Sequence, residues 1–137
     1  VRASNSTFTD HGNFSVSAGV ANDRIEEVLR AVLGELKKLK DNLVPAGELA
    51  KVKEHLVGMM YLGLESSSEL AEFYGVQEVL RRDLRTPKEK EKLIRAVTSE
   101  DIRKMARKIF TEKNLNLALI GPFEDGTNLK ELLLKSL

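Results

Sequence analysis

Cysteine is absent from the 137 residues of this sequence, and histidine is scarce, with only His11 and His55. Without a thiol, the chain can form no disulfide bond, no thiolate zinc site and no cysteine nucleophile. Long apolar runs are also missing, because the longest one covers residues 56–64 and a membrane-spanning helix needs about 20 apolar residues. We therefore expect no membrane span.

An excess of one charge is missing as well. The 22 Lys and Arg residues face 21 Asp and Glu residues, which leaves a formal net charge of +1 at pH 7. A protein that binds nucleic acid or an anionic surface needs a basic excess, so we expect no nucleic-acid partner. Hydrophobic residues make up 42% of the chain and charged residues 31%, a balance typical of a folded globular domain.

The sequence begins with Val1 rather than methionine, and no signal-peptide pattern follows. We therefore interpret residues 1–137 as a single partial domain, a fragment of a longer chain. The compartment stays open, since a chain without cysteine fits the cytoplasm and an exported bacterial protein alike.

Three segments have the pattern of strands. Residues 1–9 are rich in Ser and Thr, and residues 14–20 alternate apolar with small or polar side chains, the period of a half-buried strand. The turn-forming residues 10–13 lie between them, so we predict a β-hairpin. Residues 115–120 are almost entirely apolar, which predicts a late strand buried on both faces.

The rest of the chain has mainly helical patterns, with apolar residues at steps of three and four. Expected helix starts are Asn22 or Asp23, Pro45, Ser66 with Glu69, Thr86 with Pro87 and Glu89, and Thr98. A last short helix is expected near residues 129–135. The fold class is therefore α+β, with an antiparallel sheet of the hairpin plus the late strand packed against several helices. Three strands are few for so many helices, which again indicates a fragment.

The residues that could carry chemistry form no convincing constellation. A helical zinc hydrolase motif needs His-x-x-Glu-His, but Lys51 stands where residues 51–55 would need the first histidine. We expect these residues to form a solvated, charged helix face. His11, beside Asp10, is expected to be an exposed turn residue rather than a ligand or general base. No nucleophile elbow, phosphate loop or dinucleotide fingerprint occurs.

Four weaker features have structural readings that we favour. The run Glu65 to Glu69, with three serines inside it, is expected to be a helix break with a cap rather than a polar groove. The basic cluster of Arg81, Arg82 and Arg85 is expected to be a solvated helix end rather than a phosphate site. Met59, Met60 and Tyr61 are expected in the core. The sequons at 5–7 and 13–15 are attributed to chance. We assign no catalytic, binding or metal residue to the chain.

The order of the segments nevertheless resembles one family. Residues 8–16, with Thr9, Asp10, Gly12 and Phe14, are similar to the Thr-Asp-x-Gly-x-Phe hairpin of the insulinase/pitrilysin family of zinc peptidases. Further similarities, in chain order, are the helix end at 35–39, the helix at 44–64, residues 64–66, residues 74–77, the Ala-Val-Thr-x-Glu-Asp-Ile stretch at 96–102, and the closing strand with Gly-Pro at 117–122. The resemblance covers residues 1 to about 122.

The resemblance implies a fold and a role. Two related α+β domains of this family, of the mitochondrial-processing-peptidase-like metallohydrolase type, clamp a peptide in a closed chamber, and only the first holds zinc. This chain resembles the later part of the second, non-catalytic C-terminal domain. It would form part of the chamber wall, with no cofactor of its own and zinc in the parent's catalytic domain. Its partners would be that catalytic domain, in the same chain or a partner subunit, and peptide substrate via the parent. An open sheet edge would also allow a homodimer.

Three alternatives remain open. A fragment of the catalytic domain could contain a downstream glutamate ligand, for which Glu65, Glu69, Glu72 and Glu78 are candidates. The chain could belong to a non-enzymatic scaffold or assembly subunit on the same fold, because fold does not dictate function. It could also be an unrelated, self-contained helical binding domain, in which residues 1–20 would not pair with residues 115–120 in one sheet.

Overall fold

The structure is a computed structural model that describes residues 1–81, 83–122, 129, 132 and 133. It forms two compact units. Unit 1 contains Val1–Thr7, Gly12–Leu43 and the described part of Glu100–Leu137, and unit 2 contains Phe8–His11 and Val44–Ser99. The described residues contain five α-helices and a two-stranded antiparallel sheet, which confirms the α+β class.

Unit 1 is built around the predicted hairpin. Strand β1 (Arg2–Thr7) pairs with β2 (Gly12–Ser17) in a register that runs from Arg2 opposite Ser17 to Thr7 opposite Gly12. The hairpin is therefore confirmed, with a slightly earlier turn than predicted. Its strands are more exposed than the alternating pattern predicts, because only Val16 of β2 is half-buried.

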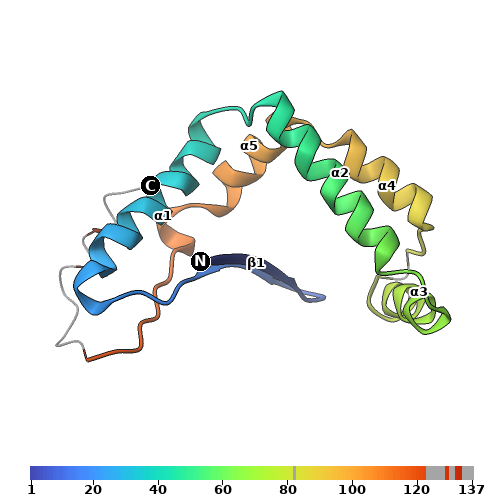
Figure 1. Cartoon of the computed structure of the whole chain (residues 1–137), viewed down its shortest axis with the longest axis horizontal. Coiled ribbons are helices and arrows are strands. Elements are labelled where there is room, and N and C mark those ends of the chain that lie inside the picture. Colours follow the sequence, from blue (N-terminus) through green and yellow to red (C-terminus); the bar gives the residue numbers. More distant parts are fainter. Residues whose placement is uncertain (82, 123–128, 130–131, 134–137) are drawn as a thin grey trace. The chain divides into compact units, whose positions relative to one another are not determined.

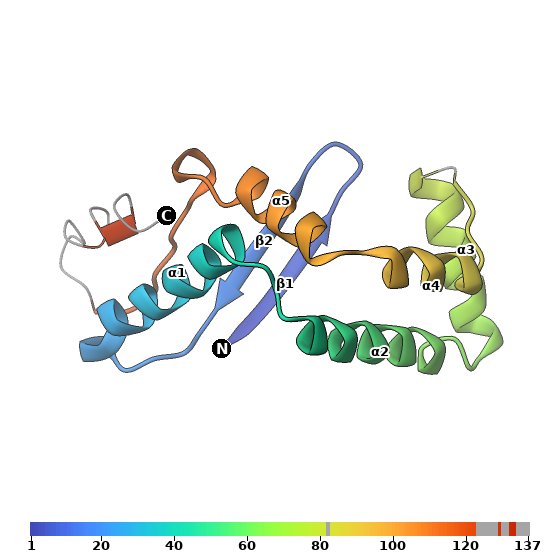
Figure 2. The same ribbon diagram turned by 90° about the horizontal axis from the view of Figure 1, so that it is seen from above.

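Two helices of unit 1 lie on one face of this hairpin (Figures 1 and 2). Helix α1 (Ile25–Asp41) follows a short 3-10 turn, η1 (Asn22–Arg24), and α5 spans Ser99–Ile109. Their apolar faces form a small core of Leu36, Ala106 and Phe110, against which Val32, Leu39 and Ile109 pack. Arg107 Nε also donates a 2.8 Å hydrogen bond to the Lys40 carbonyl, which joins the two helices near the end of α1.

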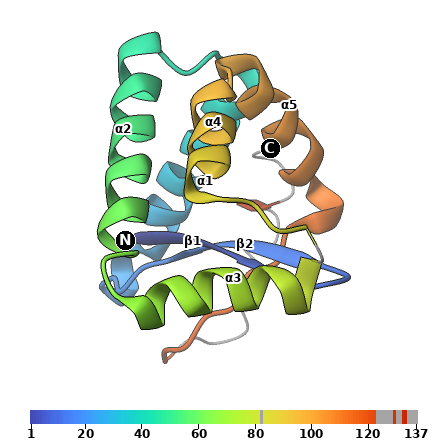
Figure 3. The same cartoon turned by 90° about the vertical axis from the view of Figure 1, so that its right-hand side faces the viewer.

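Unit 2 consists mainly of three helices, α2 (Ala46–Leu62), α3 (Ser67–Arg81) and α4 (Pro87–Ala96). Figure 3 shows α2 and α4 side by side. The capping box predicted for α3 and the cap predicted for α4 are confirmed, and the cap of α4 is also a capping box. Ser66 Oγ accepts from the Glu69 N–H at 3.2 Å, and the Glu69 carboxylate accepts from the Ser66 N–H at 3.0 Å. Thr86 and Glu89 repeat this arrangement, with Pro87 in the first turn.

The prediction of a late buried strand is wrong for the described residues. Residues 115–120 belong to no strand, and the sheet contains β1 and β2 alone. Leu117 and Leu119 are 38% and 41% exposed, and Ile120 is fully exposed. The physical reason is that apolar content favours an extended backbone but does not supply the neighbouring strand that would pair with it.

Two further expectations need correction. Neither Asn22 nor Asp23 caps α1 through its side chain, because both lie within η1 and Arg24 holds the cap position. Most of the expected helix at 129–135 lies outside the described residues, although residues 129, 132 and 133 are helical. In the part of the chain that is described, no helix is long and apolar enough to cross a bilayer.

Candidate functional site

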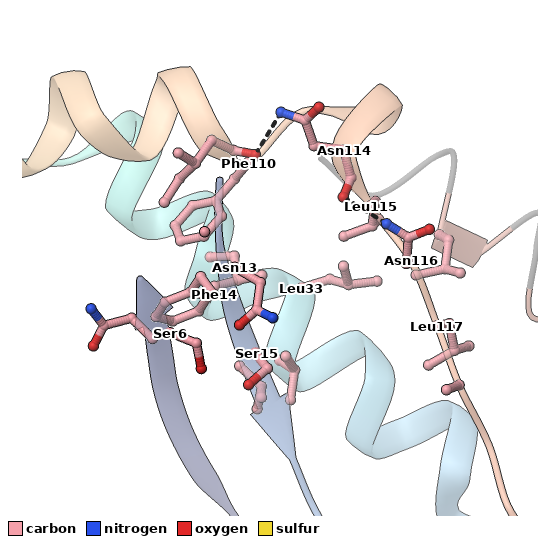
Figure 4. A pocket seen from close by; sticks show the side chains of 18 of the residues that line it. Ser6, Asn13, Phe14, Ser15, Leu33, Phe110, Asn114, Leu115, Asn116 and Leu117 are labelled. Carbon is pink, nitrogen blue, oxygen red and sulfur yellow. Dashed lines mark hydrogen bonds between the residues drawn. The ribbon is translucent and has the colours of Figure 1, made fainter. Parts of the chain in front are cut away.

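Unit 1 contains an open hollow with a volume of about 1340 Å³ (Figure 4). Its walls are the hairpin, α1, the end of α5 and the segment 113–118. Most of the side chains that α1, α5 and the segment 113–118 contribute to the hollow are apolar. Among the described lining residues, Lys113 is the one charged residue. A concave, mostly apolar surface with few polar groups is the usual form of a binding site, so this hollow is the candidate site of unit 1.

The hairpin reaches the helices of unit 1 through an aromatic contact at this hollow. The rings of Phe14, from β2, and Phe110, just after α5, lie 5.2 Å apart at an interplanar angle of 62°, an edge-to-face geometry (Figure 4). Leu33 of α1 is only 2% exposed. The contact therefore ties one side of the hollow to the small core.

Asparagine side chains hold the segment that forms the opposite wall. Asn114 Nδ2 donates to the Ile109 carbonyl at 3.3 Å, and Asn116 Nδ2 donates to the Asn114 carbonyl at 3.1 Å (Figure 4). These hydrogen bonds stabilise the 3-10 turn η2 (Glu112–Asn114) and the chain after it. Lys113 is the only acid or base that lines the hollow in the described part.

The residues that partly resemble a zinc motif instead join α2 to α4. Glu54 binds the Arg95 guanidinium through both carboxylate oxygens, and Lys53 Nζ donates to the Arg95 carbonyl at 2.7 Å. The hydrogen bond from Arg95 lowers the pKa of Glu54. These charges therefore lie on a solvated helix face and form ion pairs within unit 2.

Arg95 extends the same network to two further residues. Its Nε donates to Glu91 at 2.7 Å, and the Tyr61 hydroxyl donates to the other oxygen of that carboxylate at 2.9 Å. The hydrogen bond from Arg95, and then that from Tyr61, lowers the pKa of Glu91, while Glu91 raises the pKa of Tyr61. A carboxylic acid that donates a proton at neutral pH needs a raised pKa, whereas the pKa values of Glu54 and Glu91 are lowered. The contacts of this network instead hold α2 and α4 together.

His11 lies in the hairpin turn, as predicted. Its Nδ1 is 2.6 Å from Asp10 Oδ1, and its ring stacks on Phe8 with the centroids 4.5 Å apart. The side chains of His11 and Asp10 are 64% and 81% exposed. Such exposure leaves both side chains in contact with water, which fits a turn residue better than a ligand.

The remaining candidates have structural surroundings. The run at 65–69 forms the cap of α3, as expected. Arg85 pairs with Asp83 at 2.8 Å, whereas Arg82 and the side chain of Arg81 lie outside what the structure describes. The expectation of a core position is wrong for Met59 and Tyr61, which are 56% and 40% exposed, whereas Met60 is half-buried.

The described residues do not fit a zinc site. No group of three or more His, Asp or Glu side chains among them is placed to hold a metal ion, although zinc in proteins is usually held by at least three such ligands or by thiolates. Glu65, Glu69, Glu72 and Glu78, the candidates for a downstream ligand, are all exposed. That the chain carries no catalytic, binding or metal residue stays a prediction.

Two features of the structure have no counterpart among the sequence predictions. The hollow could not be found because it depends on a wall, 113–118, that was expected to be part of the sheet. The sequence predicts that Gln77 lies on the helix that begins at Ser66 and within the family resemblance, but not that it is 5% exposed and bonds to the backbone of Phe73 and Arg85. A buried amide holding a loop in this way has no local sequence signal.

Comparison with known proteins shows what this arrangement is related to. Residues 1–56 match the family model described as the peptidase M16 inactive domain. An uncharacterized zinc protease of Bacillus subtilis, YmxG, is 29% identical over 117 residues, which is 85% of this chain and 28% of that protein. The beta subunits of the mitochondrial-processing peptidase from Blastocladiella emersonii and Mus musculus are 26% and 30% identical over 121 residues each, 88% of this chain and 26% and 24% of those proteins.

The chain is thus a relative of the insulinase/pitrilysin zinc peptidases, through the C-terminal, inactive domain of that family. The resemblance inferred from the segment order is confirmed. The missing pairing between residues 1–20 and 115–120 does not favour an unrelated helical domain, because the matches extend over most of the chain. The chain spans about a quarter of the length of these relatives.

Proposed function

We propose that this chain is part of the non-catalytic C-terminal domain of a zinc-dependent metalloendopeptidase and forms part of the wall of its peptide-binding chamber. The observation that carries the proposal is the match of residues 1–56 to an inactive peptidase domain. The parent would hydrolyse peptide bonds with zinc held in its catalytic domain, and this chain would hold no metal. Residues 1–137 would form a single partial domain.

The partner would be the catalytic domain, in the same polypeptide or in another subunit. Support comes from the relatives, several of which are named as alpha or beta subunits of one peptidase. In unit 2, Val52, Leu56 and Met59 recur at helical steps along α2 and are 46%, 49% and 56% exposed. An apolar stripe on a charged helix is a common protein contact surface, and we assign it to this partner.

The experiment is a cleavage assay on the polypeptide that carries this chain, purified from its source with any bound subunit. A quenched fluorescent peptide should be cleaved, cleavage should stop when a chelator removes zinc, and it should return when zinc is restored. No cleavage under any of these conditions would contradict the peptidase proposal. Leu56→Asp should weaken the association of the partner, whereas Lys51→Asp, on the same helix, is the matched control that should not.

A second candidate is a non-enzymatic scaffold or assembly subunit on the same fold. The naming of relatives as subunits favours it, because such proteins work as parts of an assembly. The cleavage assay separates the two functions, since a non-enzymatic assembly would show no zinc-dependent cleavage even with its subunits bound.

An open sheet edge also supports a homodimer of the isolated chain. Both outer edges of the β1–β2 pair lack a strand neighbour in the described part, and such edges pair readily with other chains. Sedimentation of the 137-residue chain should show a dimer whose population rises with concentration. A strictly monomeric profile would count against this association.

A further inference from the structure

The free edge of β2 presents backbone groups at known positions. The Phe8 N–H donates to the His11 carbonyl at 2.9 Å, so this facing pair is a hydrogen-bonded one. Hydrogen-bonded and non-hydrogen-bonded pairs alternate along an antiparallel ladder. In the observed register, Asn13 and Ser15 therefore bond to β1, whereas the N–H and C=O groups of Phe14 and Val16 point away from it.

Beyond this free edge lies a second unpaired backbone. Figure 4 shows β2 between β1 and residues 115–117. Figure 2 likewise shows the segment that follows α5 on the β2 side of the hairpin. Leu115 has extended dihedral angles, and no backbone hydrogen bond joins residues 116–120 to another described residue. Residues 116–120 are exposed, so their unpaired peptide groups, like those on the free edge of β2, are available to an added strand.

The floor of the hollow indicates the chemistry of what would complete it. Phe14 lies on the helix-facing side of β2, against Phe110, and Leu33 and Leu36 of α1 also line the hollow. An extended segment beside β2 would direct alternate side chains to this floor. Those side chains should be apolar, because no charge in the described lining other than Lys113 could pair with them.

We propose that an extended segment from elsewhere in the same longer polypeptide fills this hollow and pairs with β2 at Phe14 and Val16. The length of the relatives indicates this occupant, since the matches cover only about a quarter of each relative. The inference rests on the proposal that residues 1–137 are a partial domain, and it adds where the remainder joins. In that case, the hollow is the place where two parts of the same domain pack together. The β2 edge that would pair copies of the isolated chain is then covered in the full polypeptide.

Residue-resolved hydrogen exchange tests the proposal on the polypeptide purified from its source, at a dilution where sedimentation shows a monomer. The amides of Phe14 and Val16 should exchange at least about tenfold more slowly than unpaired amides, as slowly as the neighbouring amides of Asn13 and Ser15. Fast exchange at Phe14 and Val16 would overturn the proposal. Protection that appears only in a dimer would also overturn it, because a second copy would then be the occupant. A native polypeptide of only 137 residues would also overturn the proposal, because no further segment would exist to fill the hollow.

A proline substitution supplies a second readout that does not depend on peptidase activity. Proline is tolerated on a strand only where its missing N–H has no partner. Val16→Pro should therefore lower the Tm of the full polypeptide by several degrees more than Val16→Thr, the control that keeps the N–H and the branched side chain. Equal Tm values for the two variants would overturn the proposal. Failure of the cleavage assay with protected amides would instead refute only the proposed activity.

Discussion

The edge-to-face contact between Phe14 and Phe110 should be measurable as a coupling energy in unit 1. Phe110 is 9% exposed, and truncating a buried phenylalanine to alanine costs about 3–5 kcal/mol. Phe14 is 41% exposed, so about three-fifths of the roughly 1.5–3 kcal/mol of a fully buried side chain gives about 1–2 kcal/mol for Phe14→Ala. The ring pair itself should contribute about 0.5–1.5 kcal/mol beyond burial.

The assay is a double-mutant cycle on the 137-residue chain, with unfolding followed in urea. The double variant should be less destabilised than the sum of the single variants by about 1 kcal/mol. Phe14→Leu is the matched control, because it keeps most of the apolar area and removes the ring, and its coupling to Phe110 should approach zero. Coupling of Phe14→Ala no larger than the roughly 0.3–0.5 kcal/mol scatter of independent sites would refute the claim that this contact joins the hairpin to the helices.

Three further outcomes follow from unit 2. Thr86→Ala should cost about 1 kcal/mol in denaturant unfolding because the capping box is lost, and Thr86→Ser should restore it; equal stability of both variants would refute the role of the hydroxyl. Gln77→Leu should cost about 1–3 kcal/mol, since the Arg85 backbone loses its partners, and unchanged stability would refute it. Arg95 lowers the pKa of Glu91 and Glu54 below their ordinary value of 4.5. The stability that the two carboxylates contribute is fully present above pH 4.5. It is lost as the pH falls through their lower pKa values in the folded state. Arg95→Met should flatten this acid-side decline in thermal melts, and an unchanged slope would contradict the assignment.

The parts of the fold that the sequence predicts well are those specified locally. The capping boxes at Ser66 and Thr86 place donor and acceptor three residues apart, and both form where predicted. The hairpin also forms, because its turn residues and its alternating strand lie next to each other in the chain. In each case, the groups that stabilise the element are near neighbours in sequence.

The parts that the sequence mispredicts depend on distant neighbours. Residues 115–120 have the composition of a buried strand, yet pairing and burial both need another strand beside them, and the described residues supply none. Met59 has an apolar side chain, as core residues do, but it lies on an exposed stripe of α2. The hollow between β2 and residues 113–118 could not be predicted for the same reason. It exists because these two segments do not pair with each other.

The location of zinc tests the central claim most directly. Zinc per polypeptide should be measured, after removal of loosely bound metal, for the 137-residue chain and for the full polypeptide with its bound partner. We expect no stoichiometric zinc in the chain and zinc in the larger species, because the described donors of the chain do not fit a site. Tight, stoichiometric zinc in the 137-residue chain alone would contradict it.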